Sequence, residues 1–227
     1  MRKITVLGIE LNDYSVRESM RRVAQYLNNG ICNTVDFITH DALLLASADE
    51  SIKSDLEGMD MVIFTSSDIL EAANVHSRSR AREIESNLFL KALLRKLAKE
   101  KRSVFLISSN AVKLESLASS LRGFFGELNI VSSVARDESV GGDDFIVNEV
   151  NMSMPDVVIM NPDGFEAENF IRENRMKINA QLIVILRDVS LRVTSDGNIR
   201  KGGIGDFLLR KIFRRAADNY EKENSSL

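Results

Sequence analysis

The chain has 227 residues, of which 44% are hydrophobic and 28% are charged, a composition typical of a soluble globular protein. Its 30 basic and 33 acidic residues give a net charge of −3, so we expect no nucleic-acid partner. The single cysteine, Cys32, excludes an intrachain disulfide and a thiolate zinc site. With only two histidines as well, we expect no metal site and no cofactor.

Neither a secretory signal nor a membrane span is expected from the sequence. Residues 1–13 are too short and too acidic for a signal peptide. The apolar stretches all fall well short of the roughly 18 residues that cross a bilayer. A cytoplasmic protein is therefore the expectation.

Short apolar runs alternate with longer segments of helical period along the chain. The first run, residues 3–9, predicts a strand. Residues 15–29 predict a helix with Ser15 as its N-cap and Glu18 at the capping-box position. Further strands are expected at residues 32–39, 59–64, 102–108, 128–133, 155–160 and 181–186, and helices near residues 41–57, 66–74, 87–101, 110–124, 142–152 and 166–177.

Several of these strands are unbroken apolar runs, which are typical of strands buried on both faces of a parallel sheet. Strands that alternate with helices at this spacing predict an α/β fold: a Rossmann-like, doubly wound, mainly parallel sheet with helices on both faces, plus a C-terminal helix. We expect one domain over residues 1–203, followed by a basic amphipathic helix and a frayed tail over residues 204–227.

Polar residues follow most of the expected strands at their carboxyl ends, in the segments 39–41, 65–68, 108–110, 161–163 and 187–188. In a doubly wound sheet these ends meet at one edge, where ligands usually bind. The same residue types are the preferred N-caps of helices. A ligand-binding rim and simple helix capping therefore both stay open.

The expected C-terminal helix is basic and amphipathic. Arg210 and Arg214 lie one turn apart with Lys211 and Arg215 beside them, and the apolar side carries Ile204, Phe207, Leu208 and Ile212. Such a helix can lie on anionic lipid, cover a partner or dock on its own domain, and docking is the default expectation. Before it, a local hairpin is expected over residues 191–203.

A resemblance to a known family rests on motifs in the same order as in that family. The cues are residues 8–20, Thr39, residues 104–108 and 149–160, and a segment at 161–175 that carries Glu168, Phe170, Ile171, Asn174 and Arg175. Together they resemble the WecG/TagA/CpsF glycosyltransferases (glycosyltransferase family 26), over about residues 8–210. The resemblance implies transfer of an N-acetylmannosamine-type sugar from UDP to a lipid-linked sugar, at the inner membrane surface.

The resemblance also implies a set of substrate-binding positions, which are Thr39, Arg82, Ser108, Ser109, Glu168 and Arg210. Arg82 belongs to a basic segment with Arg78 and Arg80 that we expect to be a loop. In the family this region borders the cleft, but a solvated loop without a ligand is the favoured interpretation. In the family, the C-terminal segment helps to bring the enzyme to the membrane and closes over the donor.

The chain departs from the family pattern where the chemistry is expected. The family's Asp-Gly pair, whose aspartate is the expected catalytic base, is Thr65 and Ser66 here. Threonine is not a base near neutral pH, and loss of a general base typically costs about 10²–10⁴ in rate. Two candidate substitutes are Asp41, which stands in place of a family asparagine, and Asp68. Both also have a helix-stabilising interpretation, Asp68 as the acid of a capping box that begins at Thr65.

Three further departures fall on positions that would hold a diphosphate or a sugar. A Gly-Gly pair is Ser108 and Ser109, whose Cβ atoms hinder a close approach of backbone to phosphate. A glutamine is Ala167, which has no side-chain donor, and Asp163 adds negative charge. The favoured hypothesis is a catalytically degenerate member that acts as a binding or scaffold module.

The alternative hypothesis is a divergent, inverting UDP-sugar hexosyltransferase in cell-envelope polysaccharide synthesis. The expected ligand is UDP or a UDP-sugar, bound weakly, and the other expected partners are a protein or a second copy of the chain. Through its C-terminal helix the protein is expected to contact the inner membrane face peripherally.

Overall fold

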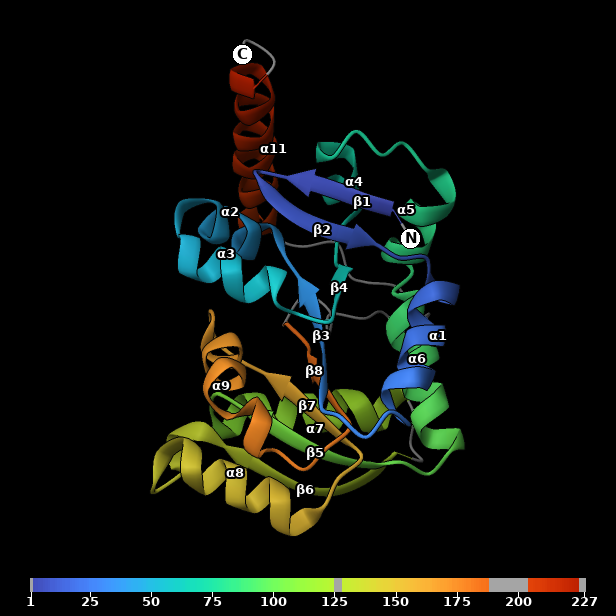
Figure 1. Ribbon diagram of the computed structural model, residues 1–227, viewed down its shortest axis with the longest axis vertical. Helices are drawn as coiled ribbons and strands as arrows, with labels where there is room; N and C mark the ends of the chain where they lie inside the picture. The colour runs from blue at the N-terminus through green and yellow to red at the C-terminus, as the bar shows by residue number, and fades with distance from the viewer. Residues whose placement is uncertain (1, 125–127, 188–203, 225–227) are drawn as a thin grey trace.

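A computed structural model describes residues 2–124, 128–187 and 204–224 of the chain (Figure 1). Its centre is a six-stranded sheet in the order β4-β3-β8-β7-β5-β6, in which every neighbouring pair is parallel. The strands are β3 (Asn33–Ile38), β4 (Met61–Phe64), β5 (Ser103–Ser108), β6 (Asn129–Ala135), β7 (Val157–Asn161) and β8 (Leu182–Ile185). The predicted parallel α/β sheet is confirmed.

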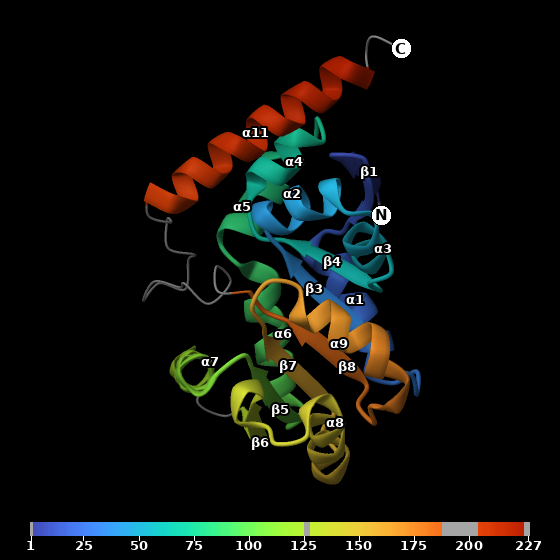
Figure 2. The ribbon, with the colours of Figure 1, turned by 90° about the vertical axis from the view of Figure 1, so that its left-hand side faces the viewer.

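Helices cover both faces of this sheet, as a doubly wound fold requires (Figures 1 and 2). One apolar cluster joins one face of the sheet to α1 (Val16–Tyr26), α6 (Leu88–Lys99) and α7 (Ala111–Phe124). The opposite face packs on α2 (His40–Ala48), α3 (Glu50–Glu57), α8 (Gly142–Ser153) and α9 (Glu166–Asn174). Successive strand residues alternate between these clusters, because side chains of a strand point to opposite faces in turn.

The strand predicted in the N-terminal apolar run is confirmed only up to Val6, and the run does not join the main sheet. It forms an antiparallel hairpin of β1 (Arg2–Val6) and β2 (Ile9–Asp13) that packs beside β4 and α3. Leu7 and Gly8 make the turn with φ angles of 52° and 77°, the left-handed pair that suits a two-residue hairpin. The following helix α1 begins as predicted, with the reciprocal capping box of Ser15 and Glu18.

Two predicted segments have a different helical structure. The expected helix 41–57 is broken at Asp49, whose carboxylate accepts hydrogen bonds from the backbone of Ser51 and Ile52 and starts α3. The expected loop around the three arginines is instead the helix α5 (Arg78–Glu85), so the loop prediction is wrong. Its N-cap is Ser77, and its one fully buried side chain, Ile84, anchors it to the apolar cluster.

The last described element is α11 (Ile204–Asn224), which packs across α2 and α4 (Ser67–Ala72) (Figure 2). It docks through Phe213 and Ala217, which are buried. The side predicted to be apolar faces solvent, because Phe207, Leu208 and Ile212 are all more than half exposed. The hairpin expected over residues 191–203 lies outside the described residues. Among the described helices, none is long and apolar enough to cross a membrane.

Candidate functional site

The sheet has a topological switch point at the carboxyl ends of β3, β8 and β7. The chain passes outward from β3 to β4 at one edge and outward from β5 to β6 at the other, and β8 and β7 lie between β3 and β5. In open α/β sheets ligands bind in the crevice outside the strand ends at such a point. The residues that surround it are therefore the candidate site.

A buried charge cluster occupies this point. Asp36 from β3, Glu168 from the first turn of α9 and Arg187 just after β8 contact one another, and their side chains are 0%, 0% and 10% exposed. Arg187 Nη2 donates to Asp36 Oδ2 at 3.1 Å and to Glu168 Oε1. Two carboxylates thus share one guanidinium inside the protein. Within the described part of the chain, Asp36 Oδ1, Glu168 Oε2 and Arg187 Nε have no hydrogen-bond partner.

The environment of the cluster changes the proton affinity of its carboxylates. Burial, together with the neighbouring charge of Asp36, raises the pKa of Glu168 from its usual 4.5 to about 7, against the attraction of Arg187. Burial also raises the pKa of Asp36. Burial alone would lower the pKa of Arg187, but the two carboxylates raise it further above its already high usual value. Since the arginine stays charged, one buried carboxyl group is left near its titration point at neutral pH.

The same arginine holds the loop between β7 and α9. Arg187 Nη1 donates to the carbonyl of Gly164 at 2.8 Å, and the guanidinium lies 5.5 Å from the centre of the Phe165 ring. The helix starts at Glu166, directly after this loop, as the sequence predicted. Phe165 is half-buried against the apolar cluster, and Ala167, in the first turn of α9, is fully buried. The side chain of Phe165 and the guanidinium of Arg187 therefore occupy the middle of the crevice.

Side chains at the ends of β5 and β7 also pair with each other. Ser108 donates to the carbonyl of Asn161 at 3.1 Å, and Ser109 donates to Glu166 Oε2 at 3.0 Å. Lys113 on α7 forms an ion pair with Asp163. The hydrogen bond and charge of Lys113 lower the pKa of Asp163. The predicted serine pair is thus at the rim, with both hydroxyl groups engaged by neighbouring protein atoms.

The predicted residues at the ends of β3 and β4 differ in burial and in hydrogen bonding. Thr65 is buried and donates to the carbonyl of Ile38 at 2.7 Å, which ties the two strand ends together. Ser66 is the N-cap of α4, so the predicted capping box from Thr65 to Asp68 is wrong. Thr39 caps α2 without a side-chain hydrogen bond, and its buried Oγ1 has no partner in the described structure. Asp41 is exposed in the first turn of α2.

Asp68 faces the C-terminal helix rather than an open crevice. Arg214 donates a hydrogen bond to its Oδ1, and Arg210 Nη1 lies 3.6 Å from its Oδ2. On the other side, His40 Nε2 is 3.7 Å from the same Oδ2. Although burial alone would raise it, the pKa of Asp68 is lowered by the hydrogen bond and charge of Arg214 and by Arg210. A carboxylate held this way is a weak base.

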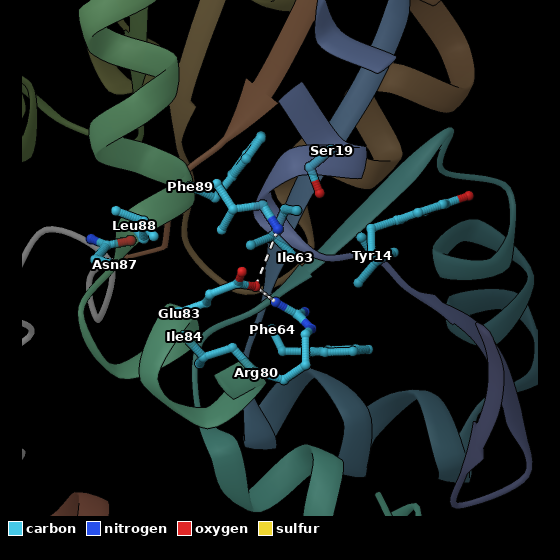
Figure 3. A pocket seen from close by; sticks show the side chains of 12 residues that line it. Tyr14, Ser19, Ile63, Phe64, Arg80, Glu83, Ile84, Asn87, Leu88 and Phe89 are labelled. Atoms are coloured by element: carbon cyan, nitrogen blue, oxygen red, sulfur yellow. Dashed lines mark hydrogen bonds and ion pairs between the residues drawn. The ribbon is translucent and has the colours of Figure 1, made fainter. Parts of the chain in front are cut away.

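Two arginines of the predicted basic segment, Arg82 and Arg80, have different environments. Arg82 is exposed near the end of α5. Its neighbour Arg80 is paired with Asp13 and Glu83 beside a small pocket of about 20 Å³ (Figure 3). A pocket of that size has room for about one water molecule and none for a sugar nucleotide. The interactions of Arg80 therefore support a structural role, in which α5 is joined to the hairpin.

The residues that sequence reasoning missed are Asp36 and, as a member of the site, Arg187. The available signal was an aspartate inside a strand whose other residues are all buried, in the sequence NTVDFI. A charged group in such a strand needs a partner. In the described residues, no group of three or more histidine, cysteine, aspartate or glutamate side chains is arranged to hold a metal ion.

Comparison with known proteins gives a match to one family model. The model described as "Glycosyl transferase WecG/TagA/CpsF family" matches residues 4–195, which is most of the chain. Among curated proteins, no relative matches the sequence. The matched range covers the hairpin except for its first two residues, the whole parallel sheet and the crevice residues described above.

Proposed function

Because the chain belongs to the WecG/TagA/CpsF glycosyltransferase family, we propose that it keeps the family fold as a binding or scaffold module and has lost the ancestral transfer reaction. One observation carries this proposal: the charged side chains around the switch point each have a partner within the protein. Arg187 holds Asp36 and Glu168, Ser109 holds Glu166, and Lys113 holds Asp163.

Transfer from a nucleotide sugar needs a group that accepts the proton of the attacking hydroxyl. At the family's expected base position, Thr65 has a neutral hydroxyl that donates to a backbone carbonyl. Of the two candidate substitutes, Asp68 is paired with two arginines and has a lowered pKa. Asp41 is exposed on the outer side of the first turn of α2. These positions favour loss of the reaction.

Transfer also needs donors or a cation that stabilise the departing diphosphate. Near the ends of β5 and β7 the available cation, Lys113, already pairs with Asp163, and Glu166 adds a second carboxylate beside Ser109. A diphosphate placed there would have to displace a carboxylate from the lysine and approach another. UDP or a UDP-sugar would accordingly bind weakly.

The partner of such a module is proposed to be a protein or a second copy of the chain, at the inner membrane face of the cell. The exposed side of α11 supports a peripheral membrane contact. It places Phe207, Leu208 and Ile212 next to the cationic Lys211 and Arg215. Apolar and cationic side chains together favour binding to anionic lipid.

A thermal-shift titration combined with a transfer assay tests the proposal. We expect no measurable shift with UDP, UDP-N-acetylglucosamine or UDP-N-acetylmannosamine at concentrations that saturate ordinary sugar-nucleotide sites, because ligands that bind the native state raise its apparent stability. We also expect no transfer to a lipid-linked sugar presented in vesicles. A clear rise in unfolding temperature without turnover would show that the protein is a module that still binds nucleotides. Turnover would overturn the proposal.

One observation favours a second candidate, a divergent inverting UDP-sugar transferase. A pKa of about 7 makes Glu168 well matched to acid–base work near neutral pH, and it lies at the switch point. If turnover is found, Glu168→Gln should abolish it while Asp41→Asn and Asp68→Asn identify any contribution of the other carboxylates. Retention of full activity in Glu168→Gln would exclude this assignment of the base.

A further inference from the structure

Docking of α11 brings one histidine into a buried contact. The ring of His40, in the first turn of α2, meets the ring of Phe213 on α11 at a centroid distance of 4.8 Å and an interplanar angle of 61°. The His40 side chain is 9% exposed and Phe213 is fully buried. The ring of His40 therefore forms part of the surface on which α11 is seated.

The polar end of this histidine is close to a carboxylate but is not hydrogen-bonded to it. His40 Nε2 lies 3.7 Å from Asp68 Oδ2, a separation beyond hydrogen-bond distance. Within the described residues neither atom has a hydrogen-bond partner. Asp68 instead receives a hydrogen bond from Arg214 and lies near Arg210. Arg210 and Arg214 of α11 thus pair with the carboxylate that a protonated imidazole of His40 would otherwise pair with.

The charges that face His40 come from three elements. Asp68 of α4 attracts a proton on the ring, as does Asp41 of α2 itself, while Arg210 and Arg214 of α11 repel it. Arg214 is also shared with Glu71 of α4, at 3.3 Å. A protonated His40 would compete with both arginines for Asp68 and would add a third positive charge to the contact.

We propose that His40 makes the docking of α11 sensitive to pH: the neutral ring allows the helix to seat, and the protonated ring releases it. The inference rests on the geometry of the contact and is independent of whether the protein binds a nucleotide sugar. Release would expose Phe213 and Ala217 and would free Arg210 and Arg214 from Asp68.

The pH range follows from the direction of the titration. Burial lowers the pKa of His40 below its usual 6.5, against the attraction of Asp68. A base whose pKa is depressed in the docked state stabilises docking fully above about pH 6.5, and this contribution is lost as the pH falls toward the docked-state pKa. Since the pKa of Asp68 is itself lowered, that carboxylate stays charged over the same range.

Hydrogen–deuterium exchange of the full chain tests the inference, with peptides from α11 compared with peptides from α6 at pH 7.5 and 5.5 after correction for intrinsic rates. In the wild type, we expect the protection of α11 relative to α6 to fall at least about threefold at the lower pH. His40→Gln, which cannot take up a proton, should remove this change. His76→Gln is the matched control, because His76 is the other histidine of the chain and is exposed.

A pH effect that persists in His40→Gln, or that α6 shares equally in the wild type, would overturn the inference. Because glutamine differs from the imidazole ring in shape, the imidazole of the wild type is also titrated by NMR, with His76→Gln used to assign the two signals. In Phe213→Ala, which removes the ring that covers His40, the pKa of His40 should rise toward 6.5. An unchanged titration of His40 in that variant would contradict the proposal as well.

Discussion

At the scale of single residues, the crevice is defined by one cation between two buried carboxylates. Arg187 contacts Asp36, Glu168 and the carbonyl of Gly164, so it joins two strands to the start of α9. Removing one partner of a buried ion pair is much more harmful than removing an exposed pair, because the remaining charge has no compensation. We therefore expect the cluster to stabilise the fold only when Asp36, Glu168 and Arg187 are all present.

Arg187→Met should destabilise the protein by about 3–5 kcal/mol, since it leaves two carboxyl groups buried without a counter-charge. The control is Arg172→Met, which breaks an ion pair between a half-exposed arginine and Asp55. That control should cost less than about 1 kcal/mol. Urea unfolding at neutral pH measures both changes. Equal effects in the two variants would refute a special role for the cluster.

Glu168→Gln should change the pH dependence of stability. A carboxyl group whose pKa is raised in the folded state favours folding fully below its unfolded value of about 4.5, and that contribution is lost as the pH rises to about 7. Between pH 5 and pH 8 the variant should therefore gain on the wild type by on the order of 1–3 kcal/mol. Asp41→Asn, at an exposed carboxylate of the rim, should show no comparable gain in the same unfolding experiments.

At the scale of elements, helix starts at the rim differ in how well they are capped. Helix α1 has a complete capping box, in which Ser15 accepts from the backbone of Glu18 and the Glu18 carboxylate accepts from the backbone of Ser15. Helix α2 starts at the switch point with Thr39, whose side chain makes no capping hydrogen bond. The hydroxyl of Thr39 is thus not used by the fold in the way that a capping residue normally is.

The difference predicts unequal effects of two alanine substitutions. Ser15→Ala should cost about 1 kcal/mol, the usual value for loss of an N-cap. Thr39→Ala should cost less than about 0.5 kcal/mol, because no capping hydrogen bond is lost and the buried hydroxyl that is removed has no partner among the described residues. Thermal unfolding of both variants measures this. A larger loss for Thr39→Ala would mean that its hydroxyl has a structural partner after all.

At the scale of the whole molecule, the sequence was sufficient to predict the parallel sheet but not the N-terminal hairpin or helix α5. Unbroken apolar runs such as VVIM predicted central strands because burial on both faces leaves no alternation. The N-terminal hairpin was missed, since Leu7 and Gly8 lie inside an apolar run and the turn is evident only from the positive φ angles of both residues. Helix α5 was missed because its segment, RSRAREIE, has little apolar periodicity.

The charge cluster could not be predicted for a topological reason. It depends on β8 lying between β3 and β7, and strands that are far apart in the chain become neighbours only through the crossover connections. Asp36 and Arg187 are 151 positions apart, so no local spacing links them. The rim residues, in contrast, were predictable because each follows its own strand directly.

The changes at the site also predict the outcome of a partial restoration. Thr65→Asp combined with Ser66→Gly should give no measurable transfer, because residues that act as a unit contribute non-additively and the positions at Ser109, Asp163 and Ala167 remain altered. The assay uses UDP-N-acetylmannosamine and an acceptor in vesicles, with an active member of the same family as the positive control. Turnover by the double variant would show that loss of the catalytic base was the only cause of inactivity.

The placement of α11 has a consequence for how the chain is made. Phe213 and Ala217 complete an apolar cluster whose other members include Ile4, Val6 and Ile9, from the N-terminal hairpin of β1 and β2. In addition, a Cβ atom built on Gly8 would lie only 3.0 Å from the hydroxyl of Tyr220. This layer can close only after α11 has left the ribosome, so a growing chain carries an incomplete apolar surface until then. A chain shortened before α11 would expose that apolar surface permanently. We therefore expect it to be bound by chaperones and cleaved by proteases even though its parallel sheet is intact.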